Sequence, residues 1–129
     1  MKIPINKETY IIFLEAELIS AFGRYKLNIA LDTGATFTMI PWDIAERLGY
    51  DPTRSAERII ITTASSIEKA PLITVERMKV LNVEVANVKV VVHDLPPKSR
   101  VDGLLGLSFL KHFDINLYFK EGFLEFKDY

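Results

Sequence analysis

The stretch Leu31-Asp32-Thr33-Gly34-Ala35-Thr36 stands out among the 129 residues of this chain. It follows Asn28-Ile29-Ala30 at the end of a strand-like run, so it places a carboxylate at the end of a predicted strand, beside a glycine that permits a tight turn. A carboxylate taken out of water is costly unless it is paired or hydrogen-bonded. Because chains that bury an acid in this way often use it for chemistry, Asp32 is the first candidate for a functional residue.

On both sides of this stretch, closely spaced runs of β-branched and aromatic residues predict strands. The predicted strands cover residues 9–19, 24–31, 37–40, 57–63, 68–75, 78–81, 83–92, 115–119 and 123–126. The first two form a predicted hairpin around Ala21-Phe22-Gly23. Short helices are predicted at residues 41–48, where Pro41 suits the first turn and Gly49 the stop, and at residues 107–112. The pattern is typical of a single, mainly β domain over residues 1–129 with one or two short helices.

Two segments of the chain repeat one order of elements. Residues 27–49 run from a strand through an acidic-glycine turn to a second strand and a helix. Residues 88–113 run from a strand through a loop and Asp102-Gly103-Leu104-Leu105-Gly106 to a helix. This repeat predicts a domain of two related halves, and a chance likeness between short β-rich segments is the alternative.

Composition narrows the classes of function. Apolar residues make up 49% of the chain, charged residues 26%, and the net charge is −1, so we expect neither nucleic acid nor a membrane as a partner. There is no cysteine, and His93 and His112 are the two histidines, so we expect no metal and no cofactor. No stretch approaches the roughly 18 apolar residues of a membrane span. The start of the sequence lacks the pattern of a signal peptide, which predicts a cytoplasmic protein.

An Asp-Thr-Gly tripeptide is by itself a weak signal, since an aspartate that caps a turn explains it equally well. Its context is more specific. Asp32-Thr33-Gly34-Ala35-Thr36 follows an apolar strand, a predicted flap-like hairpin around Ala64-Ser65-Ser66 comes next, and Leu104-Leu105-Gly106-Leu107 precedes a predicted helix. In this order the chain resembles the retropepsin-like aspartic proteases, the single-domain relatives of pepsin, over roughly residues 10–126.

The resemblance implies a closed acid-protease barrel of six or more strands that carries half of a pepsin-like site. Peptide hydrolysis of this type needs two carboxylates about 3 Å apart that share a proton, because two like charges so close cannot both ionise. The chain holds a single Asp-Thr-Gly, so two copies must meet with their Asp32 residues at a two-fold axis. The implied protein is a homodimer that cuts a peptide or protein substrate bound in an extended conformation.

The resemblance also assigns roles to single residues. Asp32 is implied to be the catalytic acid and base, Thr33 to hydrogen-bond to the other chain, and Gly34 to let the backbone approach the substrate. The implied substrate-binding residues are Ala35, Ala64, Ser65 and Leu104. For Leu104, packing in the core is an equal alternative, and Leu105 is expected in the core.

The two ends of the chain are expected to take part in the implied dimer. The last predicted strand, residues 123–126, has an open edge unless it is paired. Ile3-Pro4-Ile5 near the other end is similarly apolar. We therefore expect the termini of two chains to interleave in a β interface, as the resemblance implies.

Two departures from the viral pattern qualify the resemblance. Thr36 and Leu107 occupy positions where retroviral enzymes usually carry Asp and Arg, so the ion pair between them is absent, which points to a cellular relative. The flap tip Ala64-Ser65-Ser66 lacks the glycine expected of a mobile flap, which predicts a stiffer hairpin.

Other residues invite a functional role but have simpler explanations. Asp102 is a second carboxylate near the motif, yet an aspartate before Gly103 favours a turn. His93 is better interpreted as a residue at the end of a strand than as a base, and Trp42 is expected to pack a helix on the barrel.

The leading hypothesis for function is an aspartic endopeptidase that acts as a homodimer. A rival is a binding or assembly module that keeps the fold and has lost efficient proteolysis, because a fold does not fix a function. A third is an unrelated β-barrel ligand binder in which Asp-Thr-Gly is a turn.

Overall fold

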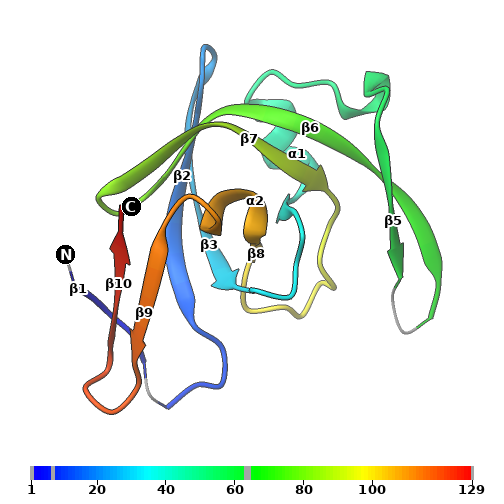
Figure 1. Cartoon of the computed structure of the whole chain (residues 1–129). Helices are drawn as coiled ribbons and strands as arrows, with labels where there is room; N and C mark the ends of the chain where they lie inside the picture. The colour runs from blue at the N-terminus through cyan, green and yellow to red at the C-terminus, as the bar shows by residue number, and fades with distance from the viewer. Residues whose placement is uncertain (1, 7, 63–64, 129) are drawn as a thin grey trace.

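The structure is a computed structural model that describes residues 2–6, 8–62 and 65–128. Its strands, shown in Figure 1, are β1 (Lys2–Pro4), β2 (Phe13–Ser20), β3 (Gly23–Leu31), β4 (Thr38–Ile40), β5 (Arg58–Thr62), β6 (Ile67–Val80), β7 (Val83–Val92), β8 (Gly103–Leu105), β9 (Asp114–Tyr118) and β10 (Phe123–Lys127). The helices are α1 (Trp42–Arg47), the single 3-10 turn η1 (Pro52–Arg54) and α2 (Leu107–Leu110).

A closed barrel forms the body of the molecule. Its strands are hydrogen-bonded in the order β2-β3-β8-β4-β7-β6, and an additional antiparallel pairing of β2 with β6 closes the ring. Strand β5 extends the sheet beyond β6. The prediction of a mainly β, closed barrel of at least six strands with short helices is therefore confirmed.

The repeat seen in the sequence corresponds to an exchange of short strands between the two halves. Strand β4 pairs in parallel with β7 of the second half, and β8 pairs in parallel with β3 of the first half. The two short strands also meet each other, antiparallel, at Met39 and Leu104. Each short strand leads into a helix, so the two halves are built alike and interlock at their centre.

The predicted break between strands at residues 68–75 and 78–81 is wrong, because β6 runs unbroken from Ile67 to Val80. Its first part pairs with β5 and its later part with β2 and β7, so the whole length has partners. Arg77 stays in register opposite Ala86. Glu76 and Arg77 are therefore exposed residues within one long strand, and the chain makes no turn there.

The first predicted strand starts too early. Strand β2 begins at Phe13, because a local turn occupies the residues before it. The Asn6 side chain accepts a hydrogen bond from the Glu8 amide (2.9 Å), and the Asn6 carbonyl accepts one from the Thr9 hydroxyl (3.1 Å). Asparagine commonly replaces strand pairing by such turns.

The chain ends form a separate three-stranded sheet in the order β1-β10-β9. Strand β1 pairs antiparallel with β10, matching Lys2 with Glu125 and Pro4 with Phe123, and β9 pairs with the other edge of β10. Both edges of β10, which the sequence left open unless paired, are paired inside one chain, and the interleaving of two chains' termini stays a prediction.

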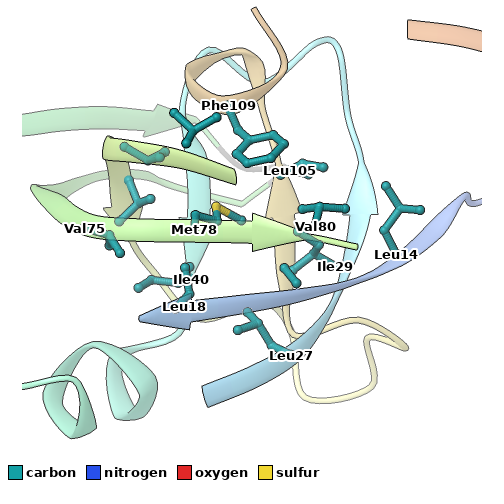
Figure 2. Close-up of a cluster of buried hydrophobic side chains, with 14 of the residues drawn as sticks. Leu14, Leu18, Leu27, Ile29, Ile40, Val75, Met78, Val80, Leu105 and Phe109 are labelled. Atoms are coloured by element: carbon teal, nitrogen blue, oxygen red, sulfur yellow. The ribbon is translucent and has the colours of Figure 1, made fainter. Parts of the chain in front are cut away.

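The core lies inside the barrel, where side chains from facing strands meet (Figure 2). Fully buried members include Leu18, Ile29, Ile40, Val75, Met78, Val80, Leu105 and Phe109. Leu105 has no exposed surface, as expected, and partly buried Trp42 packs against the same core, also as expected.

Helix α2 joins the barrel to the terminal sheet through aromatic side chains. The Phe109 ring lies 5.5 Å from that of Phe113 and 6.3 Å from that of Phe126, which is on β10. Tilted and edge-on contacts of this kind add to the free energy gained from burial. The terminal sheet is thus fixed relative to the loop that precedes α2.

Candidate active site

Asp32 lies directly after β3, in a loop that leads to β4. It is half-exposed, while Thr33 and Gly34 are exposed, so the buried carboxylate expected from the sequence is open to solvent on one side in the single chain. Its Oδ1 accepts a hydrogen bond from the Gly34 amide at 2.9 Å, and its carbonyl accepts one from the Ala35 amide at 3.2 Å. These bonds fix the carboxylate in a tight turn.

Strand β8 and helix α2 hold this loop from behind. The Asp32 amide donates to the Leu105 carbonyl (3.0 Å). The amides of Leu107 and Ser108 donate to the carbonyls of Ala35 (2.8 Å) and Thr36 (3.0 Å). The first amides of a helix have no partner within it, and here two of them bind the loop. Viral enzymes usually carry an ion pair at the positions of Thr36 and Leu107. Here each of these two residues instead takes part in one of the main-chain hydrogen bonds between the loop and α2.

A buried hydroxyl network completes the support. Thr38 on β4 has no exposed surface, and its hydroxyl accepts from the Gly106 amide and contacts Ser108 Oγ, both at 3.1 Å. Ser108 Oγ in turn accepts from the Thr38 amide at 2.9 Å. The network satisfies polar groups that would otherwise be buried without partners, which is costly.

Two positions behind the loop admit only glycine. A Cβ at Gly106 would lie 2.6 Å from the Phe37 carbonyl and 2.7 Å from the Ala35 carbonyl, and one at Gly103 would clash with the Met39 carbonyl. Two backbone segments of the same chain cross too closely there for any side chain. The glycine of Leu104-Leu105-Gly106 is therefore explained by this crossing.

The hairpin of β5 and β6 lies where a flap was predicted. Residues 58–62 pair antiparallel with residues 67–71, and Figure 1 shows the hairpin reaching away from the barrel. A hollow of about 370 Å³ separates β5 from the Asp32 loop. It is lined by Gly34, Ala35, Thr36, Phe37, Met39, Ile59, Ile60, Ile61, Thr62 and Val91.

Most of the side chains that line this hollow are apolar. Phe37 and Met39 on the loop side, and Ile59 and Ile61 on β5, pack against a small buried cluster of Ala70, Leu72 and Val91. The hollow therefore suits an apolar side chain. A hollow of similar size, about 390 Å³, lies beside Trp42 and His93, but it includes no residue of the Asp-Thr-Gly motif.

The predicted substrate-binding residues fall in different places. Ala35 lines the hollow. Ser65 is exposed near the flap tip, and Ala64 lies outside the described residues. Leu104 is half-buried on β8, paired with Ala30 and opposite Met39, and does not line the hollow.

The other two candidates have structural partners. Asp102 Oδ2 accepts from the Asn28 amide at 2.9 Å, and the Asp102 amide donates to the Asn28 carbonyl at 2.7 Å, so it fastens β3 at the entrance to β8. His93 follows β7, where its amide donates to the Ile40 carbonyl and its Nε2 lies 3.4 Å from a carboxylate oxygen of Glu68. His93 lies at the end of a strand, as preferred from the sequence. Asp102 binds β3 in place of the expected turn, because Gly103 is already the first residue of β8.

Sequence reasoning missed two parts of the site. The side chains that line the hollow from β5 could have been found from the alternation of Ile59 and Ile61 in a predicted flap strand. The Thr38–Ser108 network left no signal, because isolated hydroxyl residues are ordinary in strands and helix starts. Within the described residues, no group of three or more His, Asp or Glu side chains could hold a metal ion. No helix among them is long and apolar enough to cross a membrane.

Comparison with known proteins agrees with this arrangement. The solved structures that share the fold include a retropepsin-like aspartic protease from Rickettsia conorii and the protease of Simian Foamy Virus (mac). The first has a TM-score of 0.72 at 24% identity and covers 98% of this chain and 88% of its own. The second has a TM-score of 0.50 at 24% identity and covers 77% of this chain and 91% of its own.

The barrel and its interlocked halves thus define a retropepsin-like fold. The model of the aspartyl protease family matches residues 19–109, well over half of the chain. The chain belongs to the aspartyl protease family. No curated protein matches it.

Proposed function

We propose that residues 1–129 form one aspartic protease domain that acts as an endopeptidase when two copies bring their Asp32 carboxylates together. The observation that carries the proposal is the Asp32 loop. A half-exposed carboxylate is fixed by the Gly34 amide, clamped from behind by β8 and α2, and followed by exposed Thr33 and Gly34. This is what one half of a two-fold site requires. Membership of the aspartyl protease family supports it.

The reaction follows from two carboxylates that share one proton. The ionised Asp32 takes a proton from a water whose oxygen attacks the peptide carbonyl carbon, and the protonated Asp32 gives its proton to the carbonyl oxygen. In the second step the tetrahedral intermediate returns a hydroxyl proton to the pair while the pair protonates the amide nitrogen. The C–N bond breaks, a carboxylic acid and an amine leave, and the pair again shares one proton. Thr33 would lock the two loops together across the axis.

The proposed substrate is a peptide in an extended conformation with an apolar side chain beside the cut bond. The apolar hollow between the Asp32 loop and β5 supports this preference. Strand β5 ends the described sheet order, so its free edge is available to main-chain groups of an extended peptide.

The first prediction tests the role of Asp32. Asp32→Asn removes both acids of the dyad at once, because each copy supplies one, so cutting of a broad peptide library should fall at least 10³-fold while the fold persists. Mass spectrometry of the digested library measures the cutting. Asp43→Asn, an exposed position on α1, removes the same charge elsewhere and should leave cutting unchanged.

The outcomes separate the hypotheses. Undiminished hydrolysis by Asp32→Asn would mean that another residue performs the reaction. A wild-type protein that forms dimers but cuts no member of the library would favour the binding or assembly module over the protease.

A further inference from the structure

The outer part of the β5–β6 hairpin depends on side chains for its attachment to the barrel. Within the described residues, β6 pairs with β7 only from Leu72 onward, opposite Val91, and its earlier part pairs with β5. The Leu72 amide donates to the Glu57 carbonyl on the β5 side. Since neighbours along a strand face opposite sides, Pro71 turns toward β7 a nitrogen that carries no hydrogen. The proline therefore marks the point at which main-chain pairing with the barrel ends.

An ion pair connects the hairpin to the barrel beyond Pro71. His93 follows β7, and its amide donates to the Ile40 carbonyl at 3.0 Å, so its backbone belongs to the barrel. Its Nε2 lies 3.4 Å from Oε2 of Glu68, the second residue of β6. The His93 side chain is 23% exposed and that of Glu68 is 49% exposed, so the pair is partly withdrawn from water.

Few other charged groups face His93. Lys69 lines the same hollow of about 390 Å³, but it has the sign of a protonated histidine and cannot take the place of Glu68. Strand β4, to which the His93 amide is bonded, has no charged residue. The charged residues nearest on the other packed elements have partners or hollows of their own: Asp43 on α1, Arg58 on β5, Lys89 on β7 and Asp94 after it.

We propose that Glu68 and His93 form a latch that holds the β5–β6 hairpin against the barrel in mild acid and releases it as the pH rises. Imidazole is the side chain that gains and loses its charge between pH 5 and 8, whereas a glutamate in water is ionised over that range. Below the titration of His93 opposite charges face each other, so the latch holds. Above it the imidazole is neutral and the attraction between charges is lost.

The latch would control the width of the candidate site. Strand β5 forms one wall of the hollow beside the Asp32 loop, through residues that include Ile59 and Ile61. A held hairpin keeps this wall at a fixed place, and a released one leaves it free to move. The inference goes beyond the proposed function, because it concerns the hairpin whether or not the protein cuts peptides.

Trp42 offers a direct readout of the latch. It is the one tryptophan of the chain, and it lines the hollow together with Glu68 and His93. Acrylamide, an uncharged quencher, is titrated at several values from about pH 5.5 to about pH 8.5. Fluorescence lifetimes convert the quenching into a collision rate, which removes the quenching by the imidazolium itself. In the wild type this rate should rise about two- to fivefold with pH, the range that a pair of this exposure supports.

Three variants separate the latch from other effects of pH. Glu68→Gln removes the carboxylate and should give the high collision rate at every pH. His93→Lys keeps a positive charge throughout and should give the low rate at every pH. Glu76→Gln makes the same change at an exposed position farther along β6 and should keep the wild-type profile. Circular dichroism melting verifies folding, and sedimentation verifies that the oligomeric state is the same at both ends of the pH range.

The results that would overturn the inference are distinct. They are a wild-type collision rate that does not change with pH, a rise that persists in folded Glu68→Gln, or a rise in folded His93→Lys equal to that of the wild type.

A second measurement follows the hairpin itself, because the chain has no cysteine of its own. Ile60→Cys on β5, where the side chain is 64% exposed, and Glu46→Cys on the exposed side of α1 carry nitroxide labels. Pulsed electron paramagnetic resonance then gives the distance from hairpin to barrel, with labelled protein diluted in unlabelled protein so that distances within one chain dominate. The distribution should be narrow in mild acid and broader above neutral pH, and Glu68→Gln should make it broad at both.

Equal distributions at the two pH values in the otherwise unchanged chain would contradict the latch. A latch that passes both tests in a protein that cuts no peptide would stand, and that result would count against the proposed function instead.

Discussion

At the scale of single residues, main-chain groups position the one carboxylate of the candidate site. The Asp32 carboxylate accepts a hydrogen bond from the Gly34 amide. The loop around it is held by hydrogen bonds from the first amides of α2 to the carbonyls of Ala35 and Thr36. Gly106 matters because it carries no side chain where two of these backbone segments cross. The position of the carboxylate is therefore set by residues that do no chemistry.

Gly106→Ala tests this dependence. The new methyl group would lie 2.6 Å from the Phe37 carbonyl and 2.7 Å from the Ala35 carbonyl, so the loop must move, at a cost of about 1–3 kcal/mol of stability. Because the displaced loop carries Asp32, we expect peptide cutting to drop at least tenfold at a temperature where the variant is still folded. Ala86→Ser, which adds one atom at an exposed position of β7, is the control. A variant with wild-type activity would show that the crossing does not position Asp32.

At the scale of elements, β4 and α2 act together. The hydroxyl of Thr38 is hydrogen-bonded to the Gly106 amide and to Ser108 inside the protein. One buried hydrogen-bond network therefore joins β4, which follows the Asp32 loop, to α2, which lies behind it. Helix α2 has only four residues and depends on such contacts, since isolated helices this short are unstable.

Thr38→Val keeps the shape of the side chain and removes its hydroxyl. The Gly106 amide then loses its partner in a buried place, and we expect a loss of about 1–3 kcal/mol in the free energy of unfolding. Urea unfolding measures it. Thr74→Val, at an exposed position of β6, should change stability little. Equal small effects from both substitutions would mean that water replaces the missing hydroxyl.

The hairpin of β6 and β7 predicts a dependence of stability on pH. Arg77 donates two hydrogen bonds to the Glu84 carboxylate, at 2.9 and 3.2 Å, and the bonding lowers the pKa of Glu84. A lowered pKa in the folded state stabilises the protein above the ordinary pKa of a glutamate, and this contribution is lost as the pH falls through the lowered value.

Glu84→Gln should therefore reduce the melting temperature slightly at neutral pH, and the difference from wild type should vanish in strong acid. The effect is small because both side chains are exposed, and added salt should diminish it. Glu46→Gln on the exposed side of α1 is the control. A difference that stays constant with pH would exclude the ion pair as its cause.

Sequence reasoning worked best for long elements with a clear period. Strands β3 and β7 match their predicted ranges to within one residue, since alternating apolar residues specify both the strand and its buried face. Strands β1 and β8 were missed because each has only three residues and contains a proline or a glycine, Pro4 and Gly103, which argue against a strand. The split predicted in β6 came from treating exposed polar residues as a turn.

The site was predictable only where it coincides with a motif. Asp32 and Gly106 lie in stretches that stand out by themselves, and the structure brings them into contact through the Asp32 loop. The alternation of Ile59 and Ile61 marks one face of β5, but the position of that face beside the Asp32 loop depends on how the β5–β6 hairpin lies relative to the barrel, which no local pattern encodes. Pairing of β1 with β10 joins the two ends of the chain, a contact between residues too distant in sequence for any window to reveal.

At the scale of the whole molecule, a six-stranded barrel carries a three-stranded sheet formed by the chain ends. Phe109, Phe113 and Phe126 connect the two, so the terminal sheet is fixed relative to the Asp32 loop. In the proposed dimer each chain supplies one Asp32, so we expect the single chain to be folded but inactive.

Mixing active and inactive chains tests that central claim most directly. Wild-type protein is allowed to exchange subunits with an equal amount of Asp32→Asn, at a total concentration well above the dimer dissociation constant, and cutting is measured per wild-type chain. If each site needs an Asp32 from both copies, random pairing leaves about half of the wild-type chains in active dimers, so activity per wild-type chain should fall to about half. Unchanged activity per wild-type chain, after exchange has been verified with a mass-labelled variant, would contradict a site shared between two copies.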